Sequence, residues 1–136
     1  MIRGKTLDAE TLYLSAEEIV ALHNAVLGAG DIDPEGVVRD WNLLESATAR
    51  PRMTAYYEEA DLLRQAATLL WGLVENHPFY DGNKRTGWVA MRSFLILNGR
   101  SLHATEDKAF DLVVSVAQGL SLDATEAWLR EHIVTD

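Results

Sequence analysis

The sequence predicts a mainly α-helical fold: a compact single-domain bundle of about six helices, with little or no strand. Apolar residues recur every three or four positions, helix-capping residues precede most of these stretches, and the one strand candidate is the short run 11–14. A chain of 136 residues with 48% hydrophobic residues fits one domain with a buried core. We expect residues 1–136 to form one domain, with an extension at 1–12 and a core at about 13–133.

The first two predicted helices are marked by their N-terminal residues. Ser15 and Glu18 match a capping box, in which each side chain accepts a hydrogen bond from the backbone of the other residue. Apolar residues then follow at helical spacing up to Gly28. Asp33 and Pro34 offer an N-cap and a first-turn proline, and apolar spacing continues behind them to position 44. The sequence therefore predicts one helix after Ser15 and a second after Asp33.

Four further helices complete the predicted bundle. The two longest periodic stretches cover about residues 57–76 and 83–97, and the second stops at an Asn-Gly pair, a common helix end. Residues 105–118 and 123–132 follow, each with a capping residue in front. All four tryptophans lie within apolar helical patterns, so we expect them to pack in the core.

Composition excludes several classes of function. The chain has no cysteine, which excludes a disulfide framework, a thiolate metal site and a catalytic cysteine. A net charge of −9 argues against nucleic acid and anionic membranes as general partners. The first ten residues contain no apolar run, and no stretch approaches the roughly 20 apolar residues of a membrane span. We expect a cytoplasmic protein with no membrane contact, and nucleic acid is not expected as a partner.

The charge is unevenly distributed along the chain. Residues 82–104 contain four basic residues and no acidic residue, within a strongly acidic protein. This pattern favours a local anion site and a basic, solvent-facing helix surface about equally. The histidines at positions 23, 103 and 132 have no partner at metal-ligand spacing, so we expect them to lie at the surface or to be satisfied by hydrogen bonds.

Residues 75–86 join the two longest predicted helices and carry the chemistry. Pro78 disfavours helical geometry at the preceding residue, so the first of these helices should end at or just before His77. The imidazole would then lie at a helix exit, where it need not be buried. Phe79 is the large apolar residue of the loop and should anchor it to the core. Gly82 is free to adopt the positive φ of a turn.

The same loop leads directly into the next predicted helix. The first N–H groups of a helix lack partners within it, and together with the helix dipole they favour an anion, most commonly phosphate. Lys84 and Arg85 add two cations where the dipole disfavours them, which indicates a multiply charged anion. Asp81 can hold Mg2+ that bridges to phosphate oxygens. Each feature also occurs in ordinary interhelical turns, but their combination within nine residues favours a functional site.

The segment His77-Pro-Phe-Tyr-Asp-Gly-Asn-Lys-Arg85 resembles the central motif of the Fic/Doc superfamily. Its Lys-Arg ending is similar to the Doc (death-on-curing) toxin branch, and residues 14–23 resemble the opening helix of Doc proteins. The resemblance implies a small helical transferase that uses ATP or another nucleoside triphosphate together with Mg2+. It assigns His77 as general base, Asp81 as Mg2+ ligand, Gly82 and Asn83 as an anion nest, Lys84 and Arg85 to the phosphates, and Pro78 and Phe79 as motif support.

Two reactions are compatible with this resemblance. In Doc proteins the γ-phosphate of ATP is transferred to a threonine of elongation factor Tu, which arrests translation, whereas in Fic proteins AMP is transferred to a protein hydroxyl. Lys84 stands where AMP-transferring members usually have Gly, and Trp88 where they have a second Arg, which favours the kinase reaction. Pro78 and Gly82 are closer to the Fic pattern, so AMP transfer remains an alternative. A non-catalytic helical domain that binds a partner is a second alternative.

The resemblance also implies binding partners. These are the target translation factor and a cognate antitoxin, whose C-terminal segment would bind in a groove among the first three helices. The inhibitory pattern of many Fic proteins is not evident, because its nearest match, residues 54–58, is followed by Glu59 rather than Gly or Asn. Residues 39–52 lie where the family has a flap that positions the target, and their arginines could serve there or lie plainly at the surface.

Overall fold

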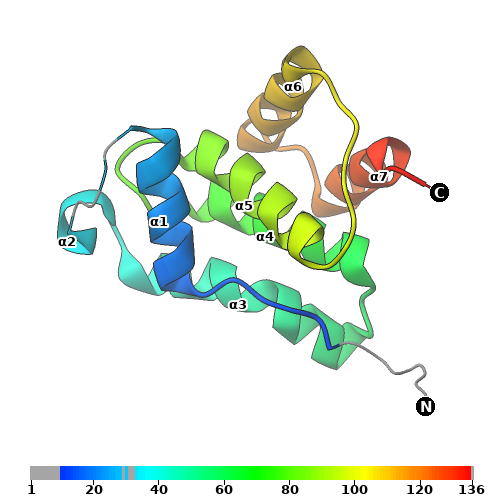
Figure 1. Ribbon diagram of the computed structural model, residues 1–136, viewed down its shortest axis with the longest axis horizontal. Helices are drawn as coiled ribbons and strands as arrows, with labels where there is room; N and C mark the ends of the chain where they lie inside the picture. The colour runs from blue at the N-terminus through cyan, green and yellow to red at the C-terminus, as the bar shows by residue number, and fades with distance from the viewer. Residues whose placement is uncertain (1–9, 29, 31–32, 136) are drawn as a thin grey trace.

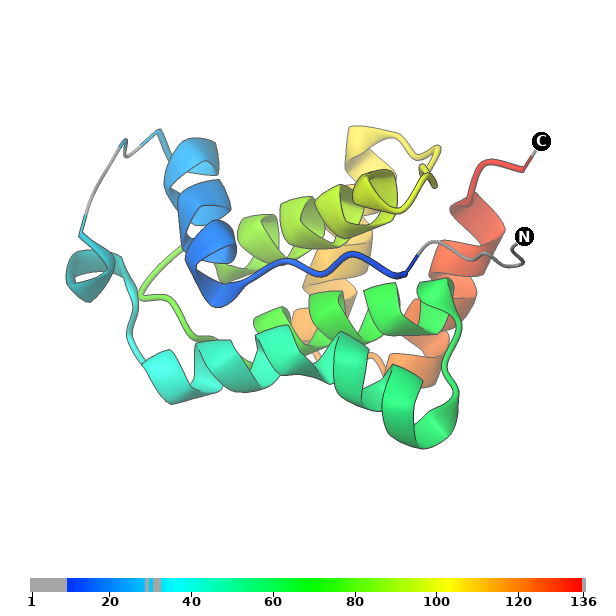
Figure 2. The same cartoon turned by 60° about the horizontal axis from the view of Figure 1, so that its bottom comes forward.

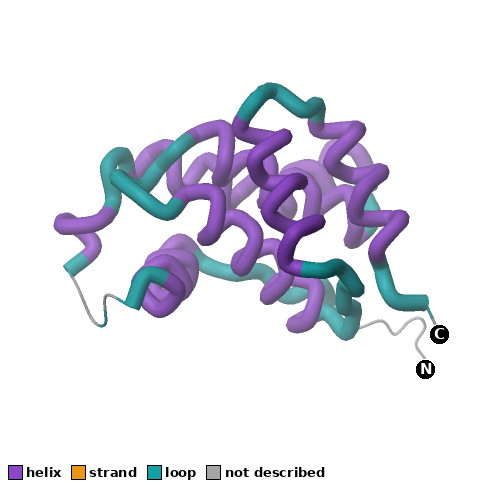
Figure 3. The backbone as a smooth tube through the Cα atoms, turned by 90° about the horizontal axis from the view of Figure 1, so that it is seen from above, coloured by secondary structure: helices purple, strands orange, loops and turns teal. Residues whose placement is uncertain are grey.

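The structure is a computed structural model that describes residues 10–28, 30 and 33–135. These residues form seven helices and otherwise loops, with only two isolated β-bridges, Val38–Phe79 and Leu102–Ile133 (Figure 3). The prediction of a mainly helical bundle is therefore confirmed. None of the helices in this part of the chain is long and apolar enough to cross a membrane. The helices are α1 (Ala16–Val26), α2 (Pro34–Val37), α3 (Trp41–Glu58), α4 (Leu62–Asn76), α5 (Asn83–Leu97), α6 (Glu106–Ala117) and α7 (Leu122–His132).

Helix α4 is the central element of the bundle. It packs against α3, α5, α6 and α7. Helix α1 packs against α5 (Figures 1 and 2). Two glycines allow the close contacts: a Cβ on Gly72 would lie 3.4 Å from the Cβ of Ala47 in α3, and one on Gly87 would lie 3.1 Å from Val74. The four tryptophans pack, partly buried, against this core as predicted.

The described residues form seven helices rather than about six, because one predicted helix is split in two. The predicted helix after Asp33 splits into α2 and α3 at residues 38–40. The backbone N–H groups of Arg39 and Asp40 donate instead to the carbonyl of Pro78, at 2.7 and 3.1 Å. This tertiary pairing interrupts the helix even though its apolar spacing continues.

The stretch predicted as one helix from about residue 57 is also divided. Helix α3 continues through Pro51 to Glu58 and ends at Glu59, which adopts the left-handed conformation with φ 54°. Asp61 then caps α4, its carboxylate accepting from the backbone N–H of Arg64. Residues 39–52, where the resemblance places a target-positioning flap, hold a bend and most of α3.

Other predicted boundaries are confirmed. The capping box of Ser15 and Glu18 is present, and α5 ends directly before Asn98. The strand candidate at residues 11–14 was wrong: this segment is a loop, held by reciprocal hydrogen bonds between the Leu12 backbone and the Asn98 side chain. Most of the predicted extension, residues 1–9, lies outside the described residues.

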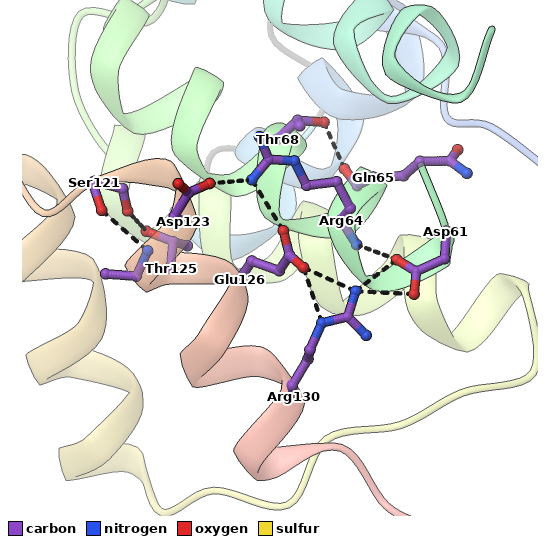
Figure 4. Close-up of polar contacts among 10 residues, drawn as sticks. Asp61, Arg64, Gln65, Thr68, Ser121, Asp123, Thr125, Glu126 and Arg130 are labelled. Atoms are coloured by element: carbon purple, nitrogen blue, oxygen red, sulfur yellow. Dashed lines mark hydrogen bonds and ion pairs between the residues drawn. The ribbon is translucent and has the colours of Figure 1, made fainter. Parts of the chain in front are cut away.

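An ion-pair network joins the start of α4 to α7 (Figure 4). Arg130 donates to both carboxylate oxygens of Asp61, at 2.8 and 2.9 Å, and to Glu126, while Arg64 donates to Asp123 and Glu126. Burial acts to raise the pKa of Asp61, but hydrogen bonds from the Arg64 backbone and the Arg130 guanidinium hold that pKa below its ordinary value. The network thus favours the ionised carboxylate in the folded state.

We predict that Asp61→Asn removes a pH-dependent part of the stability while keeping the N-cap of α4. Because the folded-state pKa of Asp61 is lowered, its contribution is present above the ordinary value of 3.8 and is lost as pH falls through the lowered pKa. The pairing is largely exposed, so the loss at pH 7 should be about 1 kcal/mol or less. Urea unfolding at pH 7, 5 and 3 measures it, and the difference between wild type and variant should shrink at pH 3.

The exposed Asp111 in α6 offers the control, since Asp111→Asn removes a carboxylate outside the network. A pH-independent difference for Asp61→Asn, or an equal effect of Asp111→Asn, would contradict this account of the network.

Candidate functional site

The loop between α4 and α5 lies at the end of the molecule formed by α1, α2 and the start of α3 (Figures 1 and 2). As predicted, α4 ends at Asn76, directly before His77 and Pro78. Phe79 is only 1% exposed and belongs to the core, as expected for the residue that anchors the loop. Gly82 has φ 79°, which confirms the predicted turn conformation.

His77 lies exposed at the end of α4 in a strained conformation. Its φ of 54° and ψ of 53° are left-handed, which costs a non-glycine residue roughly 1–3 kcal/mol. Arg39 holds this backbone in place: its Nε donates to the His77 carbonyl at 2.8 Å and its Nη2 to the Asn76 carbonyl at 3.1 Å. A cation at the C-terminus of a helix also interacts favourably with the helix dipole. Arg39 therefore fixes the backbone from which the imidazole projects.

Asn83 fixes the other half of the loop. Its buried side chain accepts from the Phe79 N–H and donates to the Phe79 carbonyl, both at 2.9 Å. The Tyr80 N–H donates to the Val37 carbonyl at 3.2 Å, which adds a contact with α2. Because the amide of Asn83 is used in this way, its backbone N–H is the group that can face an anion.

His23 of α1 makes a third contact with the loop. Its ring stacks on Phe79, with centroids 4.1 Å apart and planes 10° apart, and its Nε2 lies 2.9 Å from the Asp81 carbonyl oxygen. The ring is 2% exposed, so His23 is a histidine satisfied in the core, as expected. The contact of His23 with Asp81 was not predicted from the sequence, because these two residues lie 58 positions apart.

The N-terminus of α5 is left open by its neighbours. Gly82 is its N-cap and offers no side-chain acceptor, whereas each of the other six helices in the described residues has a side-chain cap. The first N–H groups of α5 are therefore available to an anion. Lys84 and Arg85 lie exposed in the first turn, with one Arg85 nitrogen 3.3 Å from the Val26 carbonyl.

A cavity of about 800 Å³ opens beside this helix end. The predicted residues His77, Asp81 and Gly82 to Arg85 all line it, so the structure brings these together. Pro78 and Phe79 of the same loop are buried and do not line the cavity. The other wall residues were not predicted from the sequence. Trp88 and Arg92 could have been found, because they follow Lys84 at intervals of four residues and therefore lie on the same face of α5. The opposite wall is made by Leu102, Ala104, Thr105, Glu106, Ala109, Phe110 and Val113.

Charge in the cavity is opposite in sign to that of the protein. Its wall carries Lys84, Arg85 and Arg92 against the carboxylates Asp81 and Glu106, in a chain of net charge −9. The described residues contain no group of three or more potential metal-ligating side chains. Asp81 is exposed to the cavity, and Mg2+ in nucleotide sites is commonly held by one or two carboxylates and the phosphates themselves. The donor set therefore fits a cation that arrives with a polyphosphate.

We predict that Gly82→Ala destabilises the protein for two separable reasons. A side chain is strained at φ 79°, and a Cβ would lie 2.9 Å from the Leu27 Cδ1. Gly99→Ala is the matched control, since Gly99 has φ 81° and nothing within 4 Å of a Cβ. In thermal unfolding, Gly99→Ala should lower the free energy of unfolding by about 1–2 kcal/mol, and Gly82→Ala should lower it by more.

Adding Leu27→Ala removes the contact that Gly82→Ala creates. The cost of Gly82→Ala measured in a Leu27→Ala background should therefore approach the cost of Gly99→Ala. Equal losses for the two glycines in the wild-type background would show that Leu27 does not restrict this turn.

Known proteins resemble this chain over most of its length. A model of the Fic/DOC family matches residues 13–95. The chain is 40% identical over 124 residues to "Toxin Doc" of Mycolicibacterium smegmatis, covering 88% of this chain and 92% of that protein. It is 33% identical over 120 residues to "Protein kinase doc" of Escherichia phage P1, covering 87% of this chain and 93% of that protein. The chain belongs to the Fic/Doc family.

Proposed function

We propose that this protein is a Doc-like toxin that transfers the γ-phosphate of ATP to a threonine or serine hydroxyl of a translation factor. The observation that carries the proposal is the uncapped N-terminus of α5, which faces the cavity together with Lys84, Arg85 and His77. Backbone N–H groups and two cations suit a polyphosphate, and an imidazole beside them suits an acceptor hydroxyl. Similarity to a relative named as a toxin and to one named as a protein kinase supports both parts of the proposal.

The transfer is an in-line displacement at the γ-phosphorus. His77 accepts the proton of the acceptor hydroxyl as its oxygen bonds to phosphorus, and the bond to the oxygen that bridges to the β-phosphorus breaks, releasing ADP. General base catalysis typically contributes about 10²–10⁴-fold, so electrostatic stabilisation must supply much of the remainder. The N–H groups at the start of α5, with Lys84 and Arg85, are placed to stabilise charge on the phosphoryl oxygens.

Asp81 is the residue we assign to Mg2+. Bound Mg2+ would neutralise charge on the phosphates, and its remaining ligands would be phosphate oxygens and water. One carboxylate oxygen already accepts from the Gly82 N–H at 2.8 Å, which leaves the other for the cation. Arg39 and Asn83 act through the backbone. Arg39 holds the carbonyl of His77, and Asn83 holds the backbone of Phe79, so both residues keep the loop in place.

Trp88 favours phosphate transfer over AMP transfer. It lines the cavity one turn beyond Lys84, where the resemblance expects an arginine in AMP-transferring members. A tryptophan carries no positive charge, so it cannot make the phosphate contact that the arginine would make. The cations that remain, Lys84 and Arg85, suffice for a reaction that transfers only the terminal phosphate. Transfer of AMP by the same residues remains the second reaction that the assay below distinguishes.

We further propose that a cognate antitoxin restrains this protein. The antitoxin's own C-terminal segment would bind in a groove among the first three helices of this protein. Helix α3 exposes Met53, Tyr56 and Tyr57 near its C-terminal end, and these side chains offer apolar surface to such a segment.

The test is the intact mass of purified elongation factor Tu after incubation with this protein, ATP and Mg2+. We expect a gain of one phosphoryl group, lost in His77→Ala because the general base is removed. His103→Ala is the matched control, since His103 is exposed and is not part of the cavity wall. It should retain full activity.

Each other outcome has a defined meaning. A gain of one AMP would replace the kinase reaction by adenylyl transfer. No gain under conditions in which ATP binds the protein would exclude elongation factor Tu as the target. Equal activity of wild type and His77→Ala would remove His77 from the mechanism.

A further inference from the structure

We propose that His23 of α1 is a positioning residue that orients the Asp81 carboxylate toward the bound cation. The inference rests on the proposed function, because it assigns Asp81 to Mg2+. It adds a residue that lies outside the loop motif and does not line the cavity, so His23 would act only through Asp81.

The contact between His23 and the loop is specific in its geometry. Phe79, stacked on the ring at 4.1 Å and nearly parallel to it, limits rotation of the imidazole. The Nδ1 atom lies 2.9 Å from the side-chain oxygen of Asn24, and Nε2 lies 2.9 Å from the Asp81 carbonyl oxygen. The Asp81 carbonyl oxygen and the Asn24 amide oxygen only accept hydrogen bonds, so each contact requires a proton on the ring nitrogen that makes it, and the contact with Asp81 requires that proton on Nε2.

This hydrogen bond reaches the carboxylate through one peptide group. The carbonyl of Asp81 and the N–H of Gly82 belong to the same planar unit, so fixing the carbonyl fixes the direction of the N–H. That N–H donates to the Asp81 Oδ1 at 2.8 Å. His23 therefore holds the peptide, the peptide holds one carboxylate oxygen, and the other oxygen stays available to a cation.

The position of Gly82 explains why such a restraint is needed. With φ 79°, Gly82 has the conformational freedom that lets the preceding peptide rotate. The Asp81 side chain is exposed, so no packing around it fixes its rotamer. Without the donor at Nε2, the peptide between Asp81 and Gly82 would sample other orientations, and the carboxylate would meet the cation correctly in only a fraction of molecules.

Three variants separate hydrogen bonding from packing. His23→Phe keeps an aromatic ring beside Phe79 and removes the donor. His23→Gln places an amide N–H near the position of Nε2, and His23→Asn places one near Nδ1, so only the glutamine should keep the contact with Asp81. His132→Phe is the matched control: the His132 ring also stacks on an aromatic ring, Trp128, at 3.8 Å and contacts a backbone carbonyl, but it lies in α7 outside the cavity wall.

The first readout is the Mg2+ concentration that half-saturates binding of a fluorescent ATP analogue. We expect His23→Phe and His23→Asn to raise it about three- to tenfold, the effect of losing one hydrogen bond. His23→Gln should stay within about twofold of wild type, and binding of the analogue in EDTA should not change. Loss of thermal stability without a change in Mg2+ dependence would reduce His23 to a packing residue and overturn the proposal.

The second readout needs no nucleotide. Exchange of the Gly82 amide, measured by NMR and compared with core amides of α4, should become several-fold faster in His23→Phe and unchanged in His132→Phe. If the wild-type protein fails to bind the ATP analogue, the proposed function is wrong, and this exchange rate alone decides whether His23 orients the loop. Unchanged Gly82 exchange in both His23→Phe and His23→Asn contradicts the proposal.

Discussion

The site depends on the burial of Phe79 between α1 and the N-terminus of α5. Burying a phenylalanine side chain stabilises a fold by roughly 1.5–3 kcal/mol, and here it fixes a loop that has little regular structure of its own. His23 packs on one face of the ring, and Asn83 holds both backbone groups of the same residue. The polar residues of the cavity lie on either side of this anchor in the sequence, so its position determines where they lie.

The loop carries two residues with positive φ, the strained His77 and the unstrained Gly82. His77 is strained because it ends α4 in the left-handed conformation, and Arg39 holds its carbonyl while the backbone N–H groups of residues 39–40 hold that of Pro78. Gly82 carries no strain, and a Cβ there would lie 2.9 Å from the Leu27 Cδ1, so that leucine side chain would have to shift. The first conformation points a histidine into solvent at the cavity, and the second opens the N–H groups of α5. Both are properties that a phosphate-transfer site needs and that an ordinary interhelical turn does not.

Features that depend on local chemistry could be predicted from the sequence. The end of α4 before His77, the turn at Gly82, the anchor at Phe79 and the capping box at Ser15 each follow from one or two neighbouring residues. The break between α2 and α3 could not be predicted, because it arises from backbone pairing with residues 78–80, far along the chain. The contacts of Arg39 and His23 with the loop were missed for the same reason. The opposite wall of the cavity was missed because α6 reaches α5 only through tertiary packing.

In the proposed function, the N-terminus of α5 binds the phosphate that is transferred. The most direct measurement is a crystal structure of the protein with Mg2+ and a non-hydrolysable ATP analogue. We expect the terminal phosphate on the N–H groups that follow Gly82, within reach of Lys84 and Arg85, with Mg2+ on Asp81 and His77 beside the γ-phosphorus. An α-phosphate in that position would contradict the kinase reaction, and a nucleotide bound away from the start of α5 would contradict the account as a whole.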